Sequence, residues 1–220
     1  MQYTFNFRDV WRYQDLLLEG AWLTLQLSAI TMVFGLLLGI LGASMRTSQA
    51  QPLRWTATVY VEIIRNTPLL VQLFIVFFGL PAAGVKMSAM QAAIITLSIN
   101  LGAYATEIIR AGIEAIPKSQ IEAGLSLGMS RLEVFRYVVL FPALKIIYPA
   151  LASQFILLLI ATSIVSQIAA EELFHVGTFI ESRTFRSFEV YLVITGMYLV
   201  MALFFRATFG LTYRFVFERR

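Results

Sequence analysis

Cysteine is absent from the 220-residue sequence, and histidine occurs once, at His175. Without thiols the chain has no disulfide, thiolate metal ligand or cysteine nucleophile, and one isolated imidazole does not form a metal site. The sequence also contains no GxxxxGKS/T, HExxH or GxSxG motif, which are signatures of an ATP-binding loop, a zinc-peptidase helix and a hydrolase nucleophile turn. We therefore expect that the chain is not an enzyme and holds neither a metal nor a cofactor of its own.

Charged residues are also scarce: they make up 14% of the sequence, whereas hydrophobic residues make up 59%. Soluble domains are roughly 45–50% apolar, and so few charges would not keep a globular surface in solution. The composition indicates an integral membrane protein that contacts the lipid bilayer. The net charge of +4 does not indicate a nucleic-acid partner, because the placement of Lys and Arg matters more than their sum.

Apolar runs predict an all-α, polytopic membrane protein with about five transmembrane helices and a single domain over residues 1–220. The predicted spans are Gly20–Met45, Thr67–Leu80, Met87–Ala105, Ile146–Ala169 and Val190–Leu211. Leu53–Arg65 is expected to form an interfacial helix, because Pro68 lacks an N–H and should break the helix there. The polar stretch 171–188, which contains His175, is expected to be a solvated loop.

The distribution of Lys and Arg predicts the orientation of the chain. One side carries Arg46, Arg54, Arg110, Lys118, Arg131, Arg136, Lys145, Arg214, Arg219 and Arg220. The other side carries fewer basic residues, largely offset by acidic ones. We predict an outside N-terminus and a cytoplasmic C-terminus. Met1–Glu19 shows no cleavable signal pattern, and its mixture of aromatic and charged residues is typical of an interfacial segment.

Small residues in the first predicted span indicate close contact with another helix. Gly35 and Gly39 form a GxxxG pattern, and Gly42 extends it. In a membrane, small residues let two helix backbones approach closely.

Charged residues near the spans lie close to the predicted inner interface. Glu62 and Arg65 are three residues apart, as are Glu107 and Arg110, so each pair is expected to form a structural ion pair on one helix face. No ionisable residue is expected near the centre of a span, where ion-coupled carriers place such groups. This absence favours an energy source outside the chain.

Polar residues in the fourth predicted span suggest a second kind of site. On an α-helix, Thr162, Ser163, Ser166 and Gln167 would share one continuous face, with Gln154 two turns earlier. Such residues either join helices by hydrogen bonds or line a water-filled path for a small polar solute. The sequence alone leaves both interpretations open.

The stretch from Ser119 to Pro142 is a polar interruption between two spans and carries two helix-start patterns. Ser119 precedes Glu122 by three residues, and Ser130 precedes Glu133 by three, which is the capping-box spacing. Gly128 lies between them and can adopt the left-handed conformation that ends a helix. We predict a short helix over residues 120–127, a sharp turn, and a second helix from Arg131. A short amphipathic helix of this kind suits docking into a partner's groove; an ordinary loop is the alternative.

The same stretch resembles the EAA loop of ABC-importer permeases. Glu122-Ala123-Gly124, Gly128, Val138 and Leu140 match its pattern, although Gly124 replaces the second Ala and Pro142 is displaced by one residue. GAWLTLQLS from Gly20, YVEIIRNTPLLVQLFIVFFGLP from Tyr60, GAYATEIIRAGIEAIPKSQIEAGLSLGMS from Gly102 and SRTFRSFEVYL from Ser182 are similar to polar amino-acid permeases of the histidine/glutamine/arginine type.

The resemblance implies a type I ABC importer core in a bacterial cytoplasmic (inner) membrane. The chain would form the path for a polar amino acid together with a second copy or a paralogue, and would receive solute from an extracytoplasmic solute-binding protein. The ATPase subunits, which carry ATP and Mg²⁺, would dock on a cytoplasmic loop spanning about 111–142. The coupling residues implied are Glu122, Ala123, Gly124, Leu125 and Gly128. A stand-alone secondary carrier or channel is the alternative function.

One departure from these relatives concerns the predicted path. They often carry Lys-Asp-Thr-Ser or Lys-Asn-Thr-Ser where this chain has Ile160-Ala161-Thr162-Ser163. Ala161 therefore replaces an acidic or amide residue, and a corresponding group would have to come from the partner permease. Neither the identity of the amino acid nor that of the partner permease follows from the sequence.

Overall fold

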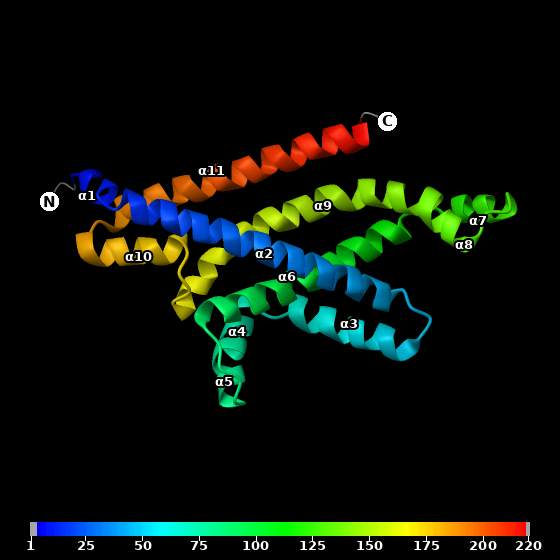
Figure 1. Ribbon diagram of the computed structural model, residues 1–220, viewed down its shortest axis with the longest axis horizontal. Helices are drawn as coiled ribbons and strands as arrows, with labels where there is room; N and C mark the ends of the chain where they lie inside the picture. The colour runs from blue at the N-terminus through cyan, green and yellow to red at the C-terminus, as the bar shows by residue number, and fades with distance from the viewer. Residues whose placement is uncertain (1–3, 219–220) are drawn as a thin grey trace.

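The computed structural model describes residues 4–218, and within that range the chain forms helices and no strands (Figure 1). Met1, Arg219 and Arg220, which entered the orientation prediction, lie outside the described residues. The helices are α1 Arg8–Trp11, α2 Gln14–Arg46, α3 Gln51–Arg65, α4 Leu69–Phe74, α5 Leu80–Ala82, α6 Ala89–Glu114, α7 Lys118–Ser126, α8 Arg131–Glu133, α9 Leu140–Ala161, α10 Leu173–Thr184 and α11 Ser187–Tyr213. Ile75–Gly79, Val134–Val139 and Arg214–Glu218 are π-helical, and Thr162–Ile168 is a 3-10 helix.

Four helices in the described part of the chain are long and apolar enough to cross a membrane. They are Gln14–Arg46, Ala89–Glu114, Arg131–Ile168 and Ser187–Glu218. The pair Gln51–Arg65 and Leu69–Ala82 is bent by 108° and would make a fifth span if counted as one. The prediction of an all-α protein with about five spans is confirmed.

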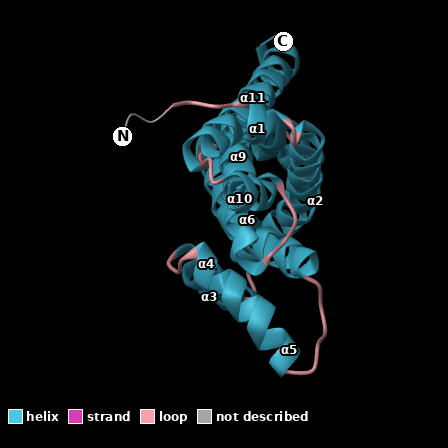
Figure 2. Ribbon diagram, turned by 90° about the vertical axis from the view of Figure 1, so that its left-hand side faces the viewer, coloured by secondary structure: helices cyan, strands magenta, loops and turns pink. Residues whose placement is uncertain are grey.

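The bent pair joins one helix that packs along the bundle to a segment that leaves it. Helix α3 runs back alongside α2, while α4 and α5 project away from the other helices (Figures 1 and 2). Ala57 and Val61 are buried, and their small side chains let α3 pack against α2 and α6. The Tyr60 hydroxyl donates a hydrogen bond of 2.7 Å to the carbonyl of Ile99. The break falls at Pro68, as predicted.

The tightest helix contact joins α2 and α6 through the predicted small residues. A Cβ added to Gly35 would meet Leu101, one added to Gly39 would meet Ala105, and one added to Gly42 would meet Thr106. The glycines therefore allow a close approach between the two longest apolar helices before the loop. This confirms the role predicted for the GxxxG pattern.

The polar stretch 171–188 is mostly helix α10, not a solvated loop. Leu173 and Ile180 are fully buried, so α10 has an apolar face that the average polarity of the stretch concealed. A Cβ at Gly177 would meet Ile194 of α11, and one at Gly20 of α2 would meet Val176. Helix α10 thus packs closely between α2 and α11. His175 lies half-buried in its first turn.

Candidate functional site

The predicted polar face of the fourth span does not form, because its residues wind as a 3-10 helix. With about three residues per turn, residues three apart share a face, and Thr162 is buried on the same side as Val165 and Ile168. Ser163 and Ser166 are half-buried on a second side, and Gln167 is exposed on a third. The assumption of an α-helical period was therefore wrong for Thr162–Ile168.

Gln154, two turns before the predicted polar face, lines a cavity of about 190 Å³ between α4, α6 and α9. Asn100 and Tyr104 of α6 also line it, as does Ala161 of α9. The remaining lining residues are Leu69, Leu101, Leu157 and Leu158. A small cavity with an amide, a second amide and a phenol among apolar side chains is suited to hold a small polar molecule.

Gln72 positions the polar wall of this cavity. Its Oε1 accepts a hydrogen bond of 3.0 Å from the Asn100 amide, while its Nε2 donates to the carbonyls of Ile64 and Thr67 at 2.8 and 3.1 Å. The buried amide thereby satisfies backbone groups freed by the helix break at Pro68. Sequence reasoning missed Gln72, Asn100 and Tyr104, although the four-residue spacing of the last two would have placed them on one face of α6.

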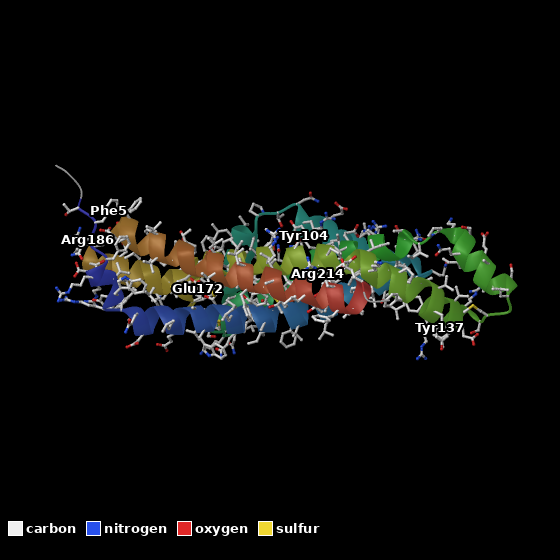
Figure 3. The ribbon with its side chains drawn as sticks, turned by 90° about the horizontal axis from the view of Figure 1, so that it is seen from above. Phe5, Tyr104, Tyr137, Glu172, Arg186 and Arg214 are labelled. Atoms are coloured by element: carbon white, nitrogen blue, oxygen red, sulfur yellow. The ribbon has the colours of Figure 1, made fainter. Side chains whose placement is uncertain are left out.

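Thr162 belongs to a separate polar cluster around the fully buried Glu172. The Tyr198 hydroxyl donates to Glu172 Oε2 at 2.5 Å, and Thr24 and Thr162 lie beside that hydroxyl. Glu172 accepts the backbone N–H groups of Phe174 and His175 at 2.9 and 2.7 Å, and so caps α10. These bonds occupy the carboxylate in a structural role. The view from above places Glu172 inside the bundle (Figure 3). Sequence reasoning overlooked this buried ionisable group.

The two predicted ion pairs have different outcomes. Glu107 and Arg110 are paired at 2.9 Å, and Arg46 at the end of α2 joins them through a contact of 3.2 Å to Glu107. Glu62 and Arg65 are not paired. The Glu62 carboxylate accepts from the Asn66 amide at 3.0 Å.

Arg65 instead lies over the ring of Tyr104, with its guanidinium carbon 5.3 Å from the ring centroid. This cation–π contact draws Arg65 toward α6, away from Glu62 on its own helix. Spacing along one helix could not reveal a partner on another.

The loop after α6 contains the predicted short helix, but it begins earlier than expected. Helix α7 spans Lys118–Ser126 with Pro117 at its N-cap, and no side chain caps it. The Ser119–Glu122 capping box is therefore not formed, because Pro117 starts the helix before Ser119 can cap it.

The second helix start is as predicted. Ser130 Oγ accepts the Glu133 N–H at 3.3 Å, and Glu133 Oε2 accepts the Ser130 N–H at 2.8 Å. Gly128 has a φ of +82°, so the turn between the helices uses the left-handed conformation that favours glycine.

Helix α7 is attached to its own chain along one side and exposed along the other. Gly124 is buried, and a Cβ there would lie 3.1 Å from Val134. Ile121 joins an apolar cluster with Ile116 and Val134, which links the end of α6 to the start of the fourth span.

The opposite side presents Glu122 and Ala123 to solvent. Leu125, Leu127 and Leu132 around the tip are 44%, 83% and 75% exposed. Figure 3 shows this part of the chain projecting beyond the end of the bundle. Exposed apolar side chains gathered at such a tip indicate a surface for contact with another protein.

A bundle of membrane-length helices, a small polar cavity between them and a short projecting helix at one end together define a membrane transport protein. The chain belongs to the family of binding-protein-dependent transport system inner membrane components, whose model matches residues 35–216. It is accordingly a multi-pass inner-membrane permease subunit of an ABC transport system. Subunits of this class work in general with an ATPase and a binding protein.

Relatives with assigned functions cover most of the chain. The L-cystine transport system permease protein TcyB of Bacillus subtilis (strain 168) is 43% identical over 74% of this chain and 69% of its own length. The glutamine transport system permease protein GlnP of Escherichia coli (strain K12) is 37% identical over 90% of this chain and 92% of its own.

Two solved structures share the fold. The crystal structure titled an amino acid ABC transporter with histidines matches with a TM-score of 0.91 and 40% identity, covering 96% of this chain and 99% of that one. An inward-facing MetNI methionine ABC transporter matches with a TM-score of 0.76 at 22% identity, covering 93% and 98%, and shows the fold alone.

Proposed function

We propose that this chain forms the translocation path of an importer for a polar amino acid. The carrying observation is the agreement in fold over nearly the whole chain with a structure titled an amino acid ABC transporter. Relatives named for L-cystine and glutamine transport support the same solute class. A second permease, identical or paralogous, would complete the path. A solute-binding protein would deliver from outside, and separate ATPase subunits would hold ATP and Mg²⁺.

The cavity beside Gln154 is the proposed solute site within this subunit. Amide and phenol groups from Gln154, Asn100 and Tyr104 offer both donors and acceptors, which matches the ammonium and carboxylate of an amino acid. Ser163, Ser166 and Gln167 extend the path at the end of α9. Thr162 instead stabilises the cluster around Glu172.

The exposed side of α7 is the proposed contact with the ATPase. Glu122, Ala123 and Leu125 would meet the ATPase, with the Gly128 turn beside them, whereas Gly124 fits α7 onto its own chain. Because the apolar cluster around Ile121 joins α7 to α6 and to the fourth span, movement of α7 would be transmitted toward α9 and the cavity. Contact with a cytoplasmic ATPase requires the orientation predicted from Lys and Arg, with α7 and the C-terminus in the cytoplasm and the N-terminus outside.

Reconstitution in liposomes tests the function directly. We expect uptake of a radiolabelled polar amino acid only when the ATPase, ATP and the binding protein are all present. Gradient-driven uptake by this chain without any ATPase would support a stand-alone carrier instead. Accessibility of tags at Met1 and Arg220 in intact cells separately tests the orientation, and a result with both sides exchanged would contradict it.

A further inference from the structure

A second cavity, of about 400 Å³, lies where α2 ends, α3 begins and α6 ends. Arg46, Arg54 and Arg110 line it together with a single carboxylate, that of Glu114. Glu114 is bound to Arg110, so its charge is already paired. Glu107 is paired with Arg46 and Arg110 as well, so the three arginines exceed the two carboxylates by one charge. The cavity therefore carries a net positive charge and lies apart from the proposed solute path.

Two of the arginines that line the cavity keep unused hydrogen-bonding groups. The Nη1 atom of Arg46 is buried without a hydrogen-bond partner in the described part of the chain, although Nη2 bonds to Glu107. The Arg54 side chain is exposed and has no ion-pair or hydrogen-bond partner among residues 4–218. The Arg46 Nη1 atom is enclosed by the chain itself, so Arg54 is the arginine that a molecule in the cavity can bind without breaking an existing ion pair.

The start of α3 adds a favourable electrostatic field. No side chain caps this 15-residue helix at Ala50, and its first N–H groups carry the positive end of the helix dipole. Gln51 in that first turn also lines the cavity. A helix N-terminus together with several arginines favours an anion with several acceptor oxygens, and phosphate is the common group of that kind.

The surroundings of the cavity favour a lipid as the source of the phosphate. Trp55 lines the cavity and is 68% exposed, and Leu53 beside it is 46% exposed. Exposed tryptophan next to arginine is typical of the headgroup level of a membrane. Basic pockets between membrane helices on the cytoplasmic side bind anionic headgroups. We propose that the α2–α3–α6 cavity binds the phosphate of an anionic membrane lipid.

Lipid retention by the purified transporter tests this proposal without relying on transport. The full-length chain, purified with its ATPase, is reconstituted into vesicles of phosphatidylcholine alone or with phosphatidylglycerol. It is then extracted in mild detergent, and bound lipids are counted by native mass spectrometry. We expect phosphatidylglycerol to be retained in preference to phosphatidylcholine. Arg54→Gln should weaken that retention about fivefold, since one basic residue near a membrane surface contributes ~1 kcal/mol.

Arg214→Gln is the matched control, because Arg214 is an exposed arginine on another helix and does not line this cavity. Its retention of phosphatidylglycerol should equal that of the unmodified chain. Equal retention by Arg54→Gln and the unmodified chain would overturn the proposal. Displacement of the retained lipid by millimolar inorganic phosphate would overturn the assignment to a lipid and indicate a soluble phosphate instead.

Discussion

Gly39 of α2 and Ala105 of α6 face each other so closely that no side-chain carbon fits at position 39 without displacing the neighbouring helix. Both residues belong to the long α2–α6 contact, which supports the cavity wall on one side and the basic cavity at its end. A membrane offers little hydrophobic drive for helix association, so the association of α2 with α6 has to be stabilised by close packing of this kind.

Gly39→Ala should destabilise the protein by about 1–3 kcal/mol, the usual range for overpacking a well-fitted contact. Thermal denaturation of the purified complex measures this. Gly196→Ala is the control, because a Cβ at Gly196 meets no other atom within 4 Å and should be tolerated or slightly stabilising. Equal melting temperatures for the two variants would contradict the role given to the α2–α6 contact.

Gly128→Arg should leave the chain inserted but uncouple ATP hydrolysis from transport. A side chain at a φ of +82° costs roughly 1–2 kcal/mol in the left-handed conformation, and the arginine would project where the ATPase is proposed to dock. Gly84→Arg is the matched control, since the φ of Gly84 is similar at +91° and an added Cβ there also meets nothing within 4 Å. The ATPase rate and the solute uptake are measured on the same proteoliposomes, and only Gly128→Arg should hydrolyse ATP without a matching uptake of solute. Normal coupling in Gly128→Arg would contradict docking of the ATPase at this turn.

Ala161→Asp should change solute selectivity toward amino acids with a cationic side chain. Ala161 lines the same cavity as Gln154 and Asn100, so the new carboxylate would sit beside the proposed solute. Competition of labelled uptake by unlabelled lysine, arginine and glutamine measures the profile, with Ala111→Asp, at an exposed position of α6, as control. An unchanged profile would move the solute site to the partner permease.

Ser163→Ala and Gln167→Ala should weaken uptake without reducing assembly with the ATPase. Loss of one neutral hydrogen bond costs on the order of 0.5–1.5 kcal/mol, which corresponds to a few-fold to about tenfold loss in apparent affinity. Thr162→Val should instead lower the yield of the complex and leave the apparent affinity for solute unchanged, because the Thr162 hydroxyl is buried in the Glu172 cluster. If all three variants lower the yield of the complex and none alters the apparent affinity for solute, these residues only join helices.

Local signals predicted the loop well only where no neighbouring residue overrode them. The Ser130–Glu133 capping box and the left-handed Gly128 were both confirmed, since each depends on a few adjacent residues. The Ser119–Glu122 box had the same spacing but failed, because Pro117 starts the helix earlier. Hydropathy placed the long helices for a similar reason: each apolar run is itself the signal.

The errors lie where a residue's role depends on a distant part of the chain. Arg65 contacts Tyr104 on α6, and Glu172 is held by Tyr198 on α11, so neither arrangement follows from spacing along one helix. The polar residues of Thr162–Ile168 were expected to share one face of an α-helix, but the segment is a 3-10 helix and its polar residues lie on different sides. The cavity combines side chains from three segments, of which the sequence identified only Gln154 and Ala161.

The capping of α10 by Glu172 has a consequence for how the protein is made. Helix α10 has 12 residues and is about 18 Å long, too short to cross a hydrocarbon layer of roughly 30 Å on its own. Its N-terminal N–H groups and the Glu172 carboxylate satisfy each other, and Tyr198 of α11 completes the arrangement. During biosynthesis, therefore, α10 should not leave the insertion machinery as an independent span but together with α11, as one hairpin.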